Sequence, residues 1–359
     1  MKKNKVKLLK SLIDIPSPSG FEEKIANFIQ TELRQYLPKT RVKIDYQNNV
    51  VAVIKGTSDK VIMIDAHSDL IGFIVNNVDR NGLISLQYIG GGDTQILTAR
   101  HLNILTDKGK LNAVVDRKHA HLVSDEDDEK IDDISEAQID IGIRGRKQVL
   151  RKVKIGDPVV YKPLFNELSE DKKLGQFFSG YGFDDKAGCF ILMEAIKEIV
   201  KTKKKPYATL VFTFSAQEET GKSKAKPLVR KYKPDLFIEA DVTFATDYGE
   251  ESLEREAGRC ELGKGIVLYR GVDIHKESFK LINNIARKNK IKVQYQACVG
   301  NIGYTSTEVS DYPTRALVLG IPLRNMHTIV ETINSKDLNY GINLLKHFCL
   351  SKSLGRILE

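Results

Sequence analysis

The sequence predicts an α/β protein: a mainly parallel sheet with helices on both faces, plus an inserted small β-barrel-like domain. Up to about residue 70, and again after Pro163, strand-like runs alternate with helical runs, which is typical of parallel sheets. Between Ile71 and Lys162, short apolar runs separated by Gly, Asp and Asn recur without a long helix, which indicates a small all-β unit. We therefore expect residues 1–70 and 163–359 to form one discontinuous α/β domain that carries residues 71–162 as an insertion.

Length and composition agree with this division. The chain has 359 residues, of which 41% are hydrophobic and 29% charged, and at roughly 150 residues per domain this length suggests two domains.

No apolar run approaches the roughly 20 residues of a membrane-spanning helix. The N-terminus superficially resembles a signal peptide, but Lys10 and Asp14 interrupt its apolar part. We expect a cytoplasmic protein without membrane contact. The four cysteines form no CxxC pair and indicate neither a zinc ribbon nor a disulfide framework.

The net charge of +9 raises the possibility of nucleic-acid binding. However, the basic residues are spread along the chain. The densest run, from Lys201 to Lys205, follows an amphipathic helix, where lysines complement the negative end of the helix dipole. We therefore expect no nucleic-acid partner.

The part before the insertion contains one helix and three strands. Residues 22–37 have apolar side chains at helical spacing between Ser19-Gly20 and Pro38. Two strands, 42–46 and 50–54, are joined by a tight turn at Asn48-Asn49, and a further buried strand begins at Val61.

The part after the insertion alternates between helices and strands. The strongest helix starts at Lys186, with an apolar face that includes Phe190 and Ile191. The other predicted helices are 225–232, 276–290 and 336–350, and the predicted strands are 208–214, 235–240, 266–268 and 316–319. Within the insertion, the glycines Gly90 to Gly92 are interpreted as a turn, since no helix follows to make them a phosphate loop.

The strand that begins at Val61 ends in His67 and Asp69. These residues are two apart, so on extended chain their side chains point the same way, where an imidazole and a carboxylate can hold a metal or orient one another. The alternative is an aspartate that caps the next turn beside an unrelated histidine.

Acidic or imidazole side chains recur at the corresponding ends elsewhere in the α/β part. They are Asp184 and Asp185 before the strong helix, Glu218 and Glu219, Asp241, and His327. Because parallel strands bring their carboxyl ends together, we expect these groups to meet at one edge of the sheet. Two histidines with several carboxylates suit two divalent ions roughly 3.5–4 Å apart. Nitrogen and oxygen ligands favour zinc, cobalt or manganese.

Eight motifs in this order resemble the metal-dependent aminopeptidases of peptidase family M42, which include glutamyl and deblocking aminopeptidases and the tetrahedral TET peptidases. The motifs are AHSDLIGF, IGGGDTQIL, IGDPVVY, GFDDKAGC, SAQEETG, EADVT, LGKG and IPLRNMHT. The resemblance covers nearly the whole chain. It implies an α/β catalytic domain with an inserted β-barrel-like dimerisation domain. It also implies self-association into dimers and hollow dodecamers, with peptides as substrates.

The resemblance further implies a ligand set. His67 would bind one metal and His327 the other, and Asp184 would bridge the two. Glu219 would join the metal of His67, and Asp241 would join the metal of His327.

Two more residues receive catalytic roles from the resemblance. Glu218 would be the general base that takes a proton from the attacking water and delivers it to the leaving amine, and Asp69 would orient His67. The implied reaction is the removal of the N-terminal residue from a peptide.

The chain departs from the pattern of the family at three places. Leu70 and Lys186 stand where relatives often have an acidic residue and Arg or Asn, respectively. Residues 301–311 replace a glycine-rich Thr-Asp segment; Thr305 and Ser306 there are candidate substrate contacts, or the segment is an ordinary turn before a helix.

Two alternatives to the aminopeptidase stay open at this point. One is a metal-dependent deacylase or a glycan-directed hydrolase on the same fold. The other is a turnover-deficient assembly protein, against which the complete ligand set and Glu218 argue.

Overall fold

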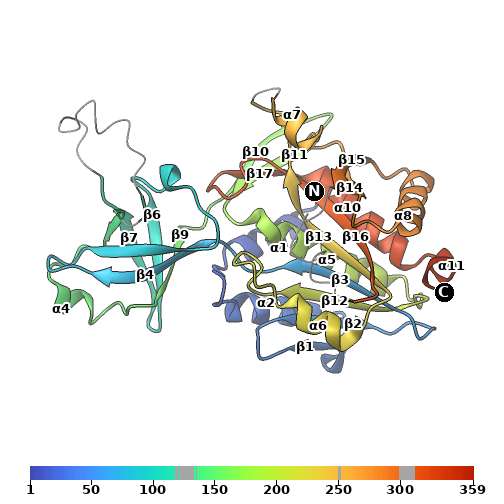
Figure 1. Cartoon of the computed structure of the whole chain (residues 1–359), viewed down its shortest axis with the longest axis horizontal. Coiled ribbons are helices and arrows are strands. Elements are labelled where there is room, and N and C mark those ends of the chain that lie inside the picture. The colour runs from blue at the N-terminus through green and yellow to red at the C-terminus, as the bar shows by residue number, and fades with distance from the viewer. Residues whose placement is uncertain (118–120, 122–132, 135, 250–251, 299–311) are drawn as a thin grey trace.

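The computed structural model describes residues 1–117, 121, 133–134, 136–249, 252–298 and 312–359. Figure 1 shows two lobes: a β-barrel at the left and a larger α/β body at the right, which holds both ends of the chain. The strands of the barrel all lie between Gly72 and Tyr161. The exact domain boundaries, 70/71 and 162/163, stay a prediction.

The α/β body is built on an eight-stranded sheet of order β1-β2-β12-β3-β13-β16-β14-β15. The strands in this order are β1 (Val42–Ile44), β2 (Val50–Ile54), β12 (Thr209–Ser215), β3 (Val61–His67), β13 (Leu236–Phe244), β16 (Arg315–Leu323), β14 (Ile266–Gly271) and β15 (Val293–Cys298). The four central strands, β12, β3, β13 and β16, are mutually parallel. Their carboxyl ends therefore lie at the same edge of the sheet.

Helices cover both faces of this sheet, as predicted (Figure 1). On one face lie α1 (Lys3–Ile13), α2 (Glu23–Leu33), α5 (Phe183–Lys201), α8 (Lys276–Lys288) and α10 (Ser335–Cys349), and on the other lies α6 (Ala225–Tyr232). Strand β3 serves both faces by alternation: Ile62 and Ile64 belong to the larger core, and Met63 packs in the core beside α6.

The barrel is a closed sheet of order β4-β5-β8-β7-β6-β9. Its strands are β4 (Gly72–Val78), β5 (Ile84–Ile89), β6 (His101–Thr106), β7 (Gly109–Val115), β8 (Gln138–Asp140) and β9 (Pro158–Tyr161), and α4 (Arg146–Val149) lies before β9. Phe73, Tyr88 and Tyr161 pack ring against ring in its interior. The barrel thus has a hydrophobic core separate from that of the body.

Several elements were not predicted from the sequence. A second sheet joins β10 (Phe165–Asp171), β11 (Gly175–Gly180) and β17 (Glu331–Asn334). Strand β10 is almost wholly exposed and polar, so it lacks a hydrophobic alternation. Helix α1 has four lysines and only three buried residues, which weakens its helical signal. The remaining short helices are η1 (Lys39–Arg41), η2 (Thr94–Ile96), α7 (Ser252–Ala257), η4 (Lys352–Leu354) and α11 (Gly355–Leu358).

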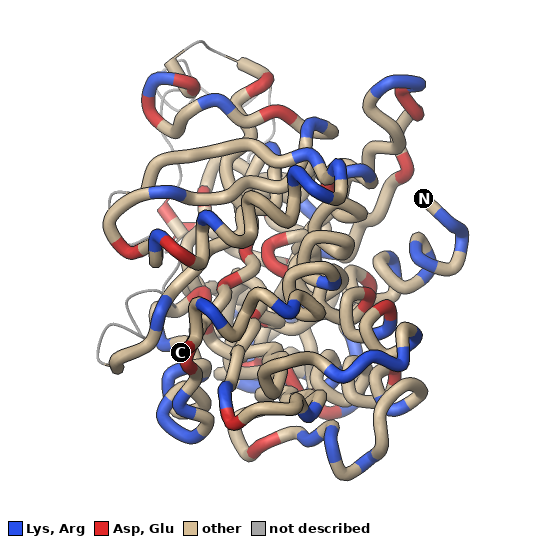
Figure 2. The backbone as a smooth tube through the Cα atoms, turned by 90° about the vertical axis from the view of Figure 1, so that its right-hand side faces the viewer, with Lys and Arg blue, Asp and Glu red and all other residues tan. Residues whose placement is uncertain are grey.

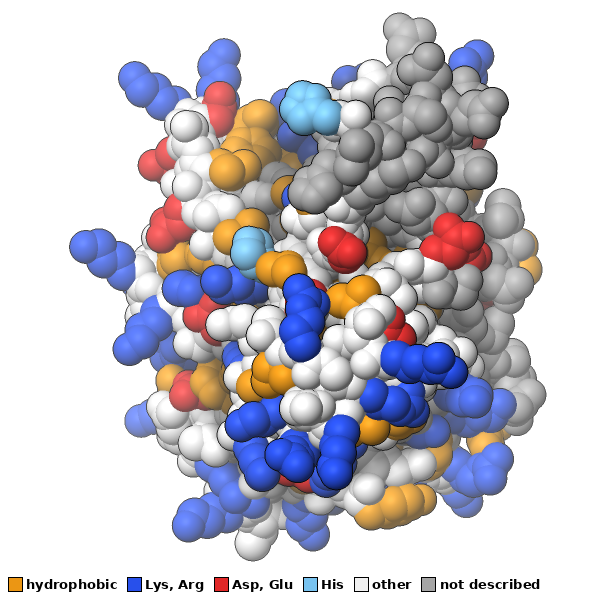
Figure 3. Space-filling view, turned by 90° about the vertical axis from the view of Figure 1, so that its left-hand side faces the viewer, with side chains coloured by type: hydrophobic (Ala, Val, Ile, Leu, Met, Phe, Trp, Pro, Cys, Tyr) orange, Lys and Arg blue, Asp and Glu red, His pale blue; other side chains and the backbone are white. Residues whose placement is uncertain are grey.

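Basic side chains are distributed over the molecule. In Figure 2, Lys and Arg segments occur along the whole backbone of the body, interleaved with acidic ones. Figure 3, which looks onto the barrel end, shows more Lys and Arg on its lower half. Exposed basic residues in and around α4 include Arg144, Arg146, Lys147, Arg151 and Lys152. Within the described part of the chain, no helix combines the length and the apolar character that crossing a bilayer requires.

Candidate metal centre

Seven side chains predicted from the sequence meet at the carboxyl edge of the sheet. They are His67 and Asp69 at and after the end of β3, Asp184 at the start of α5, Glu218 and Glu219 after β12, Asp241 in β13, and His327 after β16. Residues far apart in sequence meet because the parallel strands end side by side. The predicted substrate contacts Thr305 and Ser306 lie outside the described residues.

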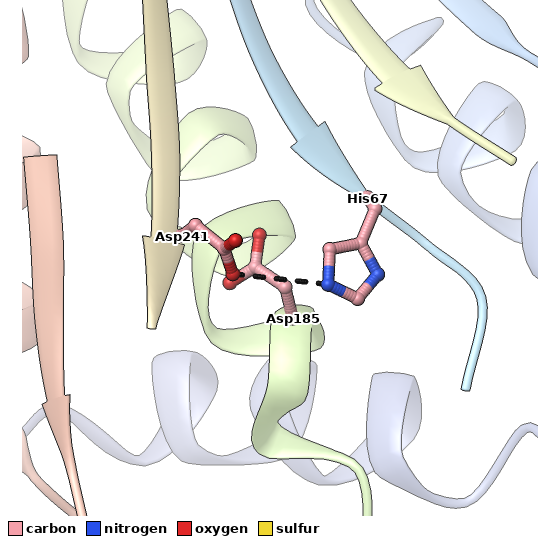
Figure 4. A group of neighbouring side chains, drawn as sticks. All are labelled: His67, Asp185 and Asp241. Carbon is pink, nitrogen blue, oxygen red and sulfur yellow. Dashed lines mark ion pairs between the residues drawn. The ribbon is translucent and has the colours of Figure 1, made fainter. Parts of the chain in front are cut away.

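The imidazole of His67 is buried between two groups of carboxylates. Its Nε2 lies 3.1 Å from Asp184 Oδ1, 3.7 Å from Asp241 Oδ1 and 3.8 Å from Glu218 Oε2, and Figure 4 shows the ring facing Asp241. Its Nδ1 lies 3.5 Å from Asp69 Oδ1. One ring nitrogen therefore faces the cluster as a potential ligand, and the other faces a carboxylate that can fix the ring.

The second histidine shares Asp184 with the first. His327 Nε2 lies 3.4 Å from Asp184 Oδ2 and 3.4 Å from Glu219 Oε2. Asp184 thus has one oxygen beside each imidazole, which is the arrangement of a bridging carboxylate.

The pairing of the other two carboxylates differs from the expectation. We expected Glu219 beside His67 and Asp241 beside His327, but the short contacts join Glu219 to His327 and Asp241 to His67. Strand β13 lies between β3 and β16, and β3 lies between β12 and β13, so the strand order allows either pairing and the side-chain contacts distinguish them. Ligand atoms of His67, Asp184 and Glu219 also lie within 4.8 Å of one another, so the whole cluster is compact.

A further carboxylate in the cluster, Asp185, was expected at this edge of the sheet but received no ligand role from the sequence. His67, Asp185 and Asp241 form a second group whose ligand atoms lie within 4.8 Å of one another (Figure 4). Asp185 Oδ1 accepts a hydrogen bond from Gly188 N, at 2.9 Å, and Oδ2 is buried without a partner. A Cβ atom at Gly188 would lie 2.3 Å from Oδ2, so a glycine is needed there. The signal was the pair of aspartates in the GFDDKAGC motif.

Asp69 does more than face His67. Its Oδ1 accepts a hydrogen bond from the backbone N–H of Glu218 at 3.0 Å, and its Oδ2 accepts from that of Glu219 at 3.1 Å. The hydroxyl of Ser19 donates to Oδ2 at 2.5 Å. This fully buried carboxylate therefore holds the segment that carries both glutamates.

Burial and crowding shift the protonation of the cluster. Burial raises the pKa of Glu218 to about 7 and that of Asp241 to about 8, in both cases against the lowering effect of His67. Burial opposes the charged form of His67, but the surrounding carboxylates, Glu218 foremost, raise its pKa well above the ordinary value. Burial also opposes ionisation of Asp184, yet hydrogen bonds with both imidazoles lower its pKa. So many carboxylates in a buried space favour positive charge between them.

Another residue missed by the sequence analysis, Glu331, lies behind the cluster. Its buried carboxylate accepts hydrogen bonds from backbone N–H groups of the segment 182–184 and from His327 N. An acidic residue four positions after His327 was the available signal, but its place in a short strand gave no reason to connect it to the site.

The barrel reaches this site through the turn Gly90 to Gly92. A Cβ atom at Gly91 would lie 3.5 Å from His327 Nδ1, and one at Gly90 would lie 3.1 Å from the backbone oxygen of Glu219. The turn therefore packs against two of the candidate ligands and forms part of the wall around them.

Comparison with known proteins identifies the lineage of the chain. A family model described as M42 glutamyl aminopeptidase matches residues 48–344, which is most of the chain. The chain belongs to this family. It is therefore an aminopeptidase-family enzyme, a hydrolase that acts on peptides.

Individual M42 relatives agree along the full length. A lysyl aminopeptidase of Pyrococcus furiosus is 30% identical over 347 residues, covering 94% of this chain and 95% of that protein. A TET aminopeptidase from a marine sediment archaeon of the Thaumarchaeota superposes with a TM-score of 0.89 at 25% identity, covering 99% and 98% of the two chains. The TET1 peptidase of Pyrococcus horikoshii, which can assemble into a tetrahedron or a large octahedral shell, has a TM-score of 0.83 at 27% identity and covers 97% and 99%.

The residues of this M42 chain fit divalent metal ions. The cluster offers only imidazole nitrogens and carboxylate oxygens, which are the donors that zinc, cobalt and manganese accept. The buried Oδ2 of Asp185 has no hydrogen-bond partner, and burial together with the neighbouring Asp241 raises the pKa of this carboxyl well above its ordinary value, so a cation there would stabilise its ionised form.

Two departures from the common M42 pattern are buried next to the cluster. Leu70 is 2% exposed and belongs to the barrel core; its Cδ2 lies 2.6 Å from where a Cβ of Gly182 would be. Lys186 is fully buried, and its Nζ donates to Ile15 O at 2.5 Å. Burial lowers the pKa of Lys186 to about 7. Both positions therefore serve packing behind the ligands.

Proposed function

We propose that this protein is a dinuclear metal-dependent aminopeptidase that removes the N-terminal residue from peptides. The observation that carries the proposal is Asp184, whose two oxygens lie 3.1 Å and 3.4 Å from the Nε2 atoms of His67 and His327. In this scheme His67 and Asp241 would hold one ion, Glu219 and His327 would hold the other, and Asp184 would contribute to both.

When bound, two divalent ions would polarise the scissile carbonyl and lower the pKa of the attacking water. Glu218 is the general base: it takes the proton of that water and returns it to the amine that leaves. Glu218 is 8% exposed as a whole residue, and its carboxylate faces the cluster, 3.8 Å from His67 Nε2. Asp69 keeps Glu218 and Glu219 in place through their backbone N–H groups.

The proposed ions are zinc or cobalt, with manganese as the third choice, because the donor set contains nitrogen and oxygen and no thiolate. The metal preference and the preferred N-terminal residue are open to direct measurement. A location in the cytoplasm stays a prediction of the sequence.

We also propose that the chain assembles through its barrel into dimers and into larger shells of the kind that its TET relative forms. Light scattering would measure the mass in solution. A dimer has twice the 40.4 kDa of one chain, and a dodecamer, the state described for another relative, has twelve times that mass. A monomeric mass would contradict the assembly proposal.

A screen of amino-acid amides, varied in the N-terminal residue and assayed with added zinc, cobalt or manganese, tests the catalytic proposal. We expect amide hydrolysis that a chelator abolishes and that one of these ions restores. Full activity after removal of all metal would overturn the proposal, and so would hydrolysis of acyl or glycan substrates in place of free-amine peptides.

A further inference from the structure

Glu331 connects two segments that carry candidate ligands. It is the first residue of β17, is 2% exposed, and pairs in register with Gly180 of β11. Strand β11 runs directly into the segment 182–184, and His327 lies four residues before Glu331. The side chain therefore stands between the two segments that deliver Asp184 and His327.

The two oxygens of this carboxylate divide between the segments. Oε2 accepts hydrogen bonds from Gly182 N at 2.9 Å, Phe183 N at 2.7 Å and Asp184 N at 3.4 Å. Oε1 accepts from His327 N at 3.1 Å. One rigid, planar group thus fixes the separation of the two backbones.

Both segments have backbone conformations that regular structure does not hold. Gly182 has φ 89°, and His327 has φ 60°, a left-handed conformation that is unfavourable for a residue other than glycine. Asp184 has non-helical dihedral angles inside α5. Such conformations persist only where the surroundings impose them, and the four hydrogen bonds to Glu331 do so.

The other half of the cluster has no need of such a group. His67 is the last residue of β3 and pairs in register with Ser215 of β12, and Asp241 within β13 pairs with Gly320 of β16, so regular strand pairing holds both backbones. A disturbance at Glu331 should therefore affect the two halves of the cluster unequally.

We propose that Glu331 is a positioning residue that holds Asp184 and His327 at the separation needed to bind the second metal ion, the one between Glu219 and His327. The inference rests on the proposed dinuclear function and goes beyond it by assigning one residue to one of the two ions. Glu331 itself does not contact the reacting atoms.

The variant Glu331→Gln tests this role because the amide has nearly the same size but only one accepting atom. Its oxygen can serve either the segment 182–184 or His327, and its NH₂ group then faces an N–H group on the other side. The matched control is Asp337→Asn: Asp337 is also buried and accepts from two backbone N–H groups, Gly263 N at 2.6 Å and Gly265 N at 2.7 Å, away from the cluster.

Cobalt is titrated into each metal-free protein, and bound ions per chain are followed by elemental analysis and visible absorption. We expect two cobalt ions in the wild type and in Asp337→Asn. In Glu331→Gln we expect one tight ion and a second bound about 10- to 100-fold more weakly, as for other residues that orient metal ligands. Excess cobalt should then restore part of kcat, which would not happen if the residue served the fold alone.

Three outcomes would overturn the inference. In the first, the wild type binds two cobalt ions and Glu331→Gln binds both equally well. In the second, Glu331→Gln weakens both ions to the same extent. In the third, the wild type binds fewer than two ions, which also removes the proposed function on which the inference rests. If Glu331→Gln does not fold, Glu331→Asp replaces it, because the shorter carboxylate cannot reach both segments and should give the same one-sided loss.

Discussion

Charged side chains are buried in the α/β body but hardly in the barrel. In the body, the buried charged groups include Asp69, Asp185, Lys186, Glu331 and Asp337. Among the described residues between 72 and 161, Asp157 alone is buried and charged, and its carboxylate accepts from Lys154 N at a turn. Apart from Asp157 and Asn103, the described residues of the barrel that are buried have no polar side chain other than the hydroxyl of Tyr161, and Phe73 and its aromatic neighbours are among the rings packed there.

The uneven distribution of buried charge shows which region supplies the reactive groups of the site. Burying a charge is costly unless it is paired or hydrogen-bonded, and the body meets that condition with backbone N–H groups and imidazoles around its carboxylates. From the described part of the barrel, the glycine turn packs on Glu219 and His327. The body therefore supplies the chemical groups, and the barrel supplies wall and packing.

The largest expected difference between the two regions comes from neutralising one carboxylate in each of them. Glu218→Gln keeps the size of the side chain and removes its ability to accept a proton, so kcat should fall by about 10²- to 10⁴-fold. Glu136→Gln, at an exposed carboxylate of the barrel, should leave kcat unchanged. Steady-state kinetics on an amino-acid amide measures both, with the assembly mass as a check of folding. Equal effects of the two changes would contradict the division.

The role of the barrel as wall is tested at Gly91. Gly91 does not have the left-handed backbone conformation that disfavours other residues, so its backbone can accept leucine. The leucine side chain would press against the His327 ring, because a Cβ atom at Gly91 would already lie 3.5 Å from His327 Nδ1. We expect kcat/KM to fall about 10- to 100-fold, since displacement of a catalytic group by about 1 Å has costs of that order. Gln87→Leu, at an exposed position of the same barrel, is the control. Unchanged kinetics in Gly91→Leu would show that the turn does not border the reacting groups.

The smallest expected effect concerns pH and stability. Burial raises the pKa of Asp337 from 3.8 to about 7 in the folded chain. Between these two values the folded state binds more protons than the unfolded state. The stability that Asp337 contributes is therefore fully present below about pH 4 and is lost as the pH rises through about 7. The slope of this contribution is at most about 1.4 kcal/mol per pH unit.

Urea unfolding across this pH range should show a steeper decline in the wild type than in Asp337→Asn, because other buried carboxylates with raised pKa values, such as Glu218 and Asp241, titrate in both proteins. Hydrogen exchange would add the regional contrast, because amides near Gly263 and Gly265 should follow the titration and those of the barrel strands should not. Parallel pH profiles of the two proteins would count against Asp337 as the titrating group.

The sequence was sufficient for most of the architecture and for the gathering of the ligands. Short continuous apolar runs identified β3, β12, β13 and β16, and the helices predicted between them indicated a mainly parallel sheet. The carboxyl ends of parallel strands meet by geometry, so the residues there could be named before their contacts were known.

What could not be predicted depends on side-chain contacts and on backbone hydrogen bonds. Strand β13 lies between β3 and β16, so the contact of Asp241 with His67 could not be read from the sequence. Glu331 acts through the N–H groups of residues distant in sequence, and a carboxylate of this kind has no local signature. Strand β10 has almost no buried residue and therefore no pattern to detect.

The passage from β3 into the barrel has a consequence for heat inactivation. Ala66 belongs to the core of the body and Leu70 to that of the barrel, so the three residues between them, which include His67 and Asp69, span the boundary of two independent cores. Melting of either core would disturb this boundary. Catalytic activity on heating should therefore end at the melting temperature of the weaker core, even while the other core keeps its secondary structure.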